Sequence, residues 1–156
     1  MKVAGALACA ALVLYPAVGS GEIKASIQPP PGWTKRGIRP YVHTWYRGAQ
    51  FVDLDTQPNR QRRTLRAYVR DIVVPASNKN GGRVIASAPT ASCAGRQPAW
   101  LLTISIDAGP GLHGLLEVVV VTSGAQAYAA SYMRPSTEPP RAEADRAIRS
   151  LCLNRL

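Results

Sequence analysis

The sequence predicts an α+β domain in which a mostly antiparallel sheet of five to six strands carries helices on both faces. Strand-like runs lie before and after a segment with helical spacing of apolar residues, and a second such segment closes the chain. One strand-like run contains Val118 to Val121 without a polar residue. Because a strand covered on one face alternates apolar and polar residues, this run indicates a layer over each face of the sheet.

Residues 1–19 have the features of a secretory signal peptide. Lys2 gives a short basic start, residues 3–18 are apolar and uncharged, and Ala17-Val18-Gly19 provides small residues before Ser20. The apolar stretch is too short for a stable membrane span. We therefore expect an exported protein, periplasmic or extracellular, with no transmembrane segment in the mature chain.

The cysteines support the same compartment. Cleavage before Ser20 removes Cys9 and leaves Cys93 and Cys152. An even number of cysteines in an exported chain indicates one disulfide bond, and a structural role for it is the favoured interpretation. A catalytic or redox thiol at Cys93 is the alternative.

The rest of the chain is expected to form a single globular domain over residues 28–156. The chain is 46% hydrophobic and 18% charged, a composition that excludes a disordered protein. Its formal net charge is +10, and residues 35–70 carry nine Lys and Arg residues against Asp53 and Asp55. An anionic partner should therefore meet the N-terminal half of the domain first.

The first half of the domain begins with a polyproline-like entry at residues 28–32, which delivers Trp33 to the edge of the core. Aromatic and β-branched residues predict a strand over 41–47, and alternation predicts another over 50–54. Residues 56–59 are expected to form a turn.

A helix is expected over residues 61–74, where apolar residues recur at helical spacing and Pro75 ends the pattern. The second half holds four strand-like runs and a final helix. That helix starts near Ser136 or Thr137, has Pro139-Pro140 in its first turn, and carries Cys152 on its buried face. The four strands are expected over 83–88, 99–107, 112–122 and 126–133.

Two patterns that could indicate cofactor or metal chemistry have simpler explanations. Residues 109–114 match G-x-G-x-x-G, but they open a strand instead of a helix, so they predict a hairpin turn and no nucleotide site. His43 and His113 lack the spacing of a metal site, and no C-x-x-C pair is present. We expect strand or turn positions for both histidines, and no cofactor and no metal.

Arginines on the predicted helix 61–74 form the one polar group that suggests binding. Four of them share a stripe beside the apolar one. They could hold phosphates or carboxylates of a membrane surface, a wall polymer or nucleic acid. The absence of interleaved aromatic residues disfavours nucleic acid, and a solvated helix face is the alternative interpretation. These arginines are Arg62, Arg63, Arg66 and Arg70.

The chain resembles the PsbP-like α/β sandwich family of small exported bacterial proteins. The resemblance rests on Pro31-Gly32-Trp33, on residues 125–134 (AQAYAASYMR) and on residues 144–152 (ADRAIRSLC). It covers residues 28–153 and implies a sheet with helices on both faces. It implies no activity, because the fold mostly serves as a binding or assembly module.

The function expected from the sequence is that of an exported, non-enzymatic binding or assembly module. Its partner would be an envelope protein or an anionic surface, contacted through the four arginines. The alternative is a small exported enzyme, either thiol-based through Cys93 or hydrolytic through His43 or His113. A purely structural subunit without a ligand of its own is a third interpretation.

Overall fold

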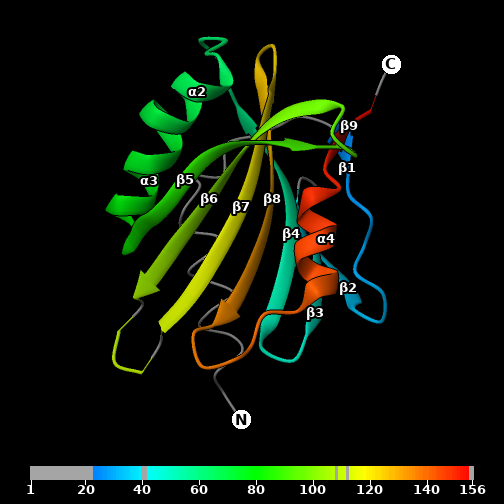
Figure 1. Ribbon diagram of the computed structural model, residues 1–156, viewed down its shortest axis with the longest axis vertical. Helices are drawn as coiled ribbons and strands as arrows, with labels where there is room; N and C mark the ends of the chain where they lie inside the picture. Colours follow the sequence, from blue (N-terminus) through cyan, green and yellow to red (C-terminus); the bar gives the residue numbers. More distant parts are fainter. Residues whose placement is uncertain (1–22, 40–41, 108, 112, 155–156) are drawn as a thin grey trace.

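The computed structural model describes residues 23–39, 42–107, 109–111 and 113–154 (Figure 1). The expected signal peptide over residues 1–19 lies outside these ranges. A seven-stranded antiparallel sheet dominates the fold, with strand order β2-β3-β4-β8-β7-β6-β5. Its strands are β2 (Thr34–Arg39), β3 (Val42–Arg47), β4 (Gln50–Pro58), β5 (Gly82–Ser92), β6 (Gln97–Asp107), β7 (His113–Ser123) and β8 (Gln126–Pro135).

Two very short strands form a separate antiparallel pair beside this sheet. β1 (Ala25–Ser26) pairs with β9 (Cys152–Leu153), with Ala25 opposite Leu153 and Ser26 opposite Cys152. This pair brings the first described residues together with the last ones (Figure 1). The expected position of Cys152 on a helix is therefore wrong, because α4 (Ala142–Arg149) ends before it.

One helical segment crosses from β4 to β5. It consists of α2 (Leu65–Tyr68), the π-helical turn η1 (Val69–Val73) and α3 (Val74–Lys79). Pro75 does not end the helix, contrary to the prediction. The Val74 N–H bonds back to Val69 O in the wider π turn, so Pro75 occupies the first turn of α3, where a missing N–H is tolerated.

The predicted fold class is wrong. The sheet has seven strands instead of five to six and is accompanied by the β1–β9 pair, so the protein is mostly β. The helices are too short to form a layer on each face: α4 has eight residues, and the other segment is divided into parts of four, five and six. The α/β/α sandwich implied by the PsbP-like resemblance is therefore not the architecture of this chain.

Two errors in the predicted strands explain part of the difference between the predicted and the observed fold. β2 was missed because its sequence, TKRGIR, is polar and does not alternate, and pairing with β3 creates the strand. The expected turn at 56–59 is largely the end of β4, where Thr56 and Gln57 pair with β8. Pro58 fits there because the β3 ladder stops at Asp55, so the missing N–H has no strand partner on that side.

The sheet separates the apolar residues into two clusters. Val118 and Val120 belong to one cluster, and Val119 and Val121 belong to the other. β7 is therefore buried on both faces, as its uninterrupted apolar run predicts. Trp33 is also buried, as expected, and meets the ring of Tyr132 edge to face at 6.3 Å between centroids.

The buried hydroxyl of Tyr132 forms hydrogen bonds that connect residues 136–141, which precede α4, to the sheet. Tyr132 Oη donates to Gln50 Oε1 and accepts a hydrogen bond from the Arg141 backbone N–H at 2.9 Å. Gln50 Nε2 in turn donates to Glu138 Oε2 at 2.8 Å. The network connects β4, β8 and residues 136–141, and it satisfies groups that are removed from water.

We expect Tyr132→Phe to lower the free energy of unfolding by about 1–3 kcal/mol, because the Arg141 N–H and Gln50 Oε1 would each lose a buried partner. Urea unfolding followed by circular dichroism measures this change. Tyr46→Phe is a comparison variant, since Tyr46 is partly exposed and its hydroxyl bonds to the Thr44 side chain, outside this network. Equal losses in the two variants would show that the network does not stabilise the fold.

Candidate functional site

The four arginines expected to bind an anion lie at the start of the helical segment. Arg62 and Arg63 precede α2, Arg66 lies within it, and Arg70 lies in η1. Arg62 has a positive φ of 48°, which places it in the tight turn that leads into the helix. Thr64 caps the helix and accepts a hydrogen bond from the Ala67 N–H at 3.4 Å.

Asp71 brings two of these arginines together. Arg70 Nε and Nη2 donate to its two carboxylate oxygens at 2.6 and 3.0 Å, and Arg63 Nε lies 3.6 Å from Oδ2. The hydrogen bonds from Arg70 hold the pKa of Asp71 below its usual value and raise the pKa of Arg70. This pairing could not be predicted from the sequence.

Arg62 and Arg66 are exposed, and neither forms an ion pair with another residue in the described part of the chain. The segment therefore keeps excess positive charge after Asp71 is counted. We use the name arginine face for this surface, whose members are Arg62, Arg63, Arg66 and Arg70. Its chemistry suits an anion such as a phosphate or a carboxylate.

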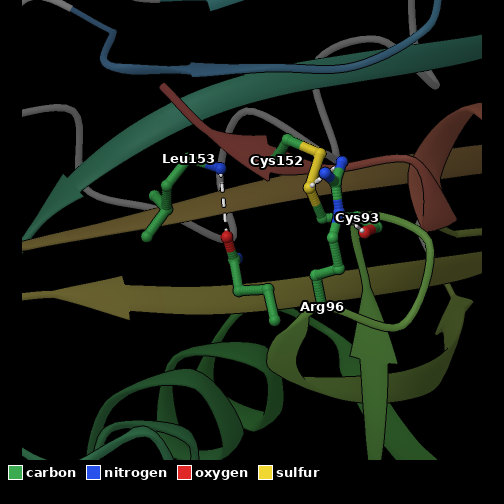
Figure 2. Close-up of a pocket in the computed structure, with 5 residues that line it drawn as sticks. Cys93, Arg96, Cys152 and Leu153 are labelled. Atoms are coloured by element: carbon green, nitrogen blue, oxygen red, sulfur yellow. Dashed lines mark hydrogen bonds between the residues drawn. A yellow bond between two sulfur atoms is a disulfide. The ribbon is translucent and has the colours of Figure 1, made fainter. Parts of the chain in front are cut away.

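A second candidate site is an open pocket of about 380 Å³ beside the disulfide bond (Figure 2). Cys93 and Cys152 are bonded, with their Cα atoms 4.7 Å apart, which confirms the predicted pairing. The bond joins the turn between β5 and β6 to β9. The pocket is lined by Cys93, Arg96, Gln97, Cys152 and Leu153.

The turn that carries Cys93 has an unusual backbone. Cys93, Ala94 and Gly95 have φ values of 55°, 55° and 80°. For the first two residues this left-handed conformation costs about 1–3 kcal/mol each, which other contacts must offset. Arg96 supplies one such contact by donating from Nε to the Cys93 carbonyl at 3.1 Å.

Arg96 also lies next to a sulfur of the disulfide bond. Its Nη2 is 3.5 Å from Cys93 Sγ, so a guanidinium charge faces one of the two sulfur atoms (Figure 2). The neighbouring Gln97 accepts a hydrogen bond from the Leu153 N–H at 3.1 Å. This bond holds β9 against the start of β6 independently of the disulfide.

Two acidic residues of β4 were not foreseen as special. Val52 and Leu54 pack in one apolar cluster, so Asp53 and Asp55 point to the opposite face with Phe51. Burial raises the pKa of Asp53 to about 6 and that of Asp55 to about 7. Acidic residues at i and i+2 within an apolar strand were the pattern that could have revealed them.

The histidines lie apart from each other. His43 is in β3 and His113 begins β7, and β4 and β8 lie between these strands. Burial and the nearby Lys35 lower the pKa of His43, while His113 Nδ1 lies 3.6 Å from the exposed Asp107. Within the described ranges, no three His, Cys, Asp or Glu side chains group as metal ligands. The hydrolytic alternative through these histidines gains no support from this geometry.

A hairpin connects β6 to β7, as predicted: residues 109–111 lie in the turn, and His113 and Gly114 already belong to β7. Asp107 Oδ1 accepts a hydrogen bond from the Gly109 N–H at 3.2 Å, and Gly109 and Gly111 have positive φ values.

Among the described residues, no helix has the length and apolar character needed to cross a bilayer.

Comparison with known proteins shows similarity at the level of fold only. No protein family model and no curated protein matches the sequence. A crystal structure of a Bacteroides thetaiotaomicron protein superposes with a TM-score of 0.57 at 11% sequence identity. The alignment covers 87% of this chain and 47% of that protein, so this chain spans about half the length of its structural neighbour.

Proposed function

We propose that this protein is exported and acts as a non-enzymatic binding module that contacts an anionic envelope surface through its arginine face. The observation that carries the proposal is the excess charge of that face. Arg62, in the turn before α2, and Arg66, within α2, are both exposed and take no part in the Arg63–Asp71–Arg70 ion pairs.

The geometry of the arginine face favours contact with a surface over a small-molecule site. Its side chains project from a turn and a helix, and Arg70 is 72% exposed, so they can reach several anionic groups at once. Electrostatic attraction to anionic lipids contributes about 1 kcal/mol per Lys or Arg near the surface. An anionic protein partner would use the same charges, so vesicles serve as the first probe.

The disulfide bond supports the export part of the proposal. Disulfide bonds form and persist in oxidising compartments and are rare in the cytosol. The Cys93–Cys152 bond therefore fits a periplasmic or extracellular location, which is also where an envelope surface would be met.

We expect the purified protein to bind phosphatidylglycerol vesicles more tightly than phosphatidylcholine vesicles, with an affinity that falls as salt is raised. Replacing both arginines in Arg62→Glu/Arg66→Glu should weaken binding by at least about 30-fold at low salt, because each lost arginine contributes roughly 1 kcal/mol and each new carboxylate is repelled by the surface. Vesicle co-sedimentation over a salt series measures both effects.

A control variant must separate the arginine face from net charge. Arg83→Glu/Arg146→Glu makes the same charge change at exposed positions on β5 and α4. We expect it to weaken binding far less than the first variant does. Equal weakening by both variants, or binding that does not respond to salt, would contradict a specific role for the arginine face.

A further inference from the structure

Three features meet at the pocket beside the disulfide bond. Both sulfur-bearing residues line an open cavity, so the bond is within reach of a small molecule (Figure 2). A guanidinium nitrogen of Arg96 lies 3.5 Å from Cys93 Sγ. Cys93 and the following Ala94 are held in left-handed backbone conformations. A bond whose only role is structural requires none of these features.

We propose that the Cys93–Cys152 bond is a reversible redox link that exchanges with low-molecular-weight thiols entering this pocket, with Cys93 as the leaving sulfur beside Arg96. The positive charge beside Cys93 Sγ distinguishes the two sulfur atoms. It stabilises a thiolate there relative to the thiol, and a better leaving group makes exchange faster.

The exchange takes place in two balanced steps. A thiolate attacks Cys152 Sγ and forms a mixed disulfide, while the bond between the cysteines breaks and its electron pair leaves on Cys93 Sγ. A second thiolate then attacks the outer sulfur of the mixed disulfide and releases Cys152 as a thiolate. Two small thiols are oxidised to their disulfide, and the two protein cysteines are reduced and take up the protons.

Reduction would change the attachment of the β1–β9 pair while leaving the large sheet intact. The disulfide is the covalent link between β9 and the β5–β6 turn. The hydrogen bond from the Leu153 N–H to Gln97 remains after the bond is broken. The reduced protein therefore keeps its fold, with β1 and β9 held by weaker contacts.

The test measures reduction of the folded, full-length protein by reduced glutathione at pH 7.5. New thiols are trapped by alkylation and counted by intact mass, while circular dichroism monitors the fold. We expect reduction in the folded state at a rate proportional to glutathione concentration. Arg96→Gln should slow the reaction roughly three- to tenfold because the leaving thiolate loses its counter-charge.

Two further variants make the test specific. Arg96→Lys keeps the charge and should react within about twofold of the natural protein, which also shows whether position 96 tolerates replacement. Arg83→Gln removes an exposed arginine from the other end of β5 and should have no effect. The proposal is overturned if reduction is independent of glutathione concentration, or if Arg96→Gln reacts like Arg83→Gln.

Discussion

Replacing Cys93 and Cys152 together by alanine should lower the free energy of unfolding by about 4 kcal/mol. The bond closes a loop between residues 59 positions apart, and the unfolded chain gains conformational freedom when that constraint is removed. A loss of this size is a large part of the roughly 5–15 kcal/mol by which ordinary domains are stable.

Urea unfolding of the double variant and of the oxidised protein, followed by circular dichroism, measures this difference. The natural protein in excess reductant should match the double variant, because both lack the same constraint. Replacing Cys93 alone leaves an unpaired Cys152 and is a less suitable comparison. A loss below about 1 kcal/mol would show that the unfolded chain is already restrained without the bond.

The stability of the protein should fall as pH rises from about 5 to 8. The pKa values of Asp53 and Asp55, about 6 and about 7 in the folded state, lie above those of an unfolded chain. Between these limits the folded protein holds protons that the unfolded chain releases, so stability is lost as pH rises through the folded-state values. The two groups together contribute on the order of a few kcal/mol.

Asp55→Asn should remove much of this dependence, because an amide has nearly the same shape and carries no charge. We expect the stability of the variant relative to the natural protein to increase by about 1–3 kcal/mol between pH 5 and pH 8. Thermal or urea unfolding at several pH values gives the difference between the two proteins. The lowered pKa of His43 makes the fold more stable as pH rises, which is opposite to the effect of Asp55. His43 is present in both proteins, so its contribution drops out of the difference between them.

Asp145→Asn is the matched control for this experiment. Asp145 is an exposed acid that pairs with Arg149 at 2.9 Å, so its loss should change stability by less than about 1 kcal/mol at either pH. A natural protein that becomes more stable between pH 5 and 8 relative to Asp55→Asn would show that burial does not raise these pKa values.

Features that depend on local chemistry could be predicted from the sequence. The pairing of Cys93 with Cys152 followed from counting the cysteines that remain after the expected cleavage, and the structure contains the bond. The hairpin turn after β6 followed from glycines that open a strand. The burial of β7 on both faces followed from Val118 to Val121. The turn and the burial of β7 follow from adjacent residues, and the cysteine pairing follows because only two cysteines remain after the expected cleavage.

Features that depend on tertiary pairing could not be predicted from the sequence. β2 has a polar sequence and exists because β3 offers an unpaired edge, and β4 extends to Pro58 because β8 pairs with it. The helix continues past Pro75 because a π turn shifts its hydrogen bonds. These errors shortened the predicted sheet and produced the wrong fold class.

The candidate site shows the same division. The arginines were found from their helical spacing, but their pairing through Asp71 was not, since it depends on side-chain conformations. Arg96 could not be predicted as part of a site, because only the folded turn places its guanidinium beside Cys93. The pocket needs β9, which lies far from β5 and β6 in the sequence.

Export is the claim on which the proposed function depends most, because an envelope surface and an oxidised cysteine pair both require it. Intact mass of the protein recovered from its exporting host, after alkylation under denaturing and non-reducing conditions, tests it directly. We expect a chain that begins at Ser20 and carries no alkylated cysteine. A chain that retains residues 1–19, with Cys93 and Cys152 alkylated, would contradict it.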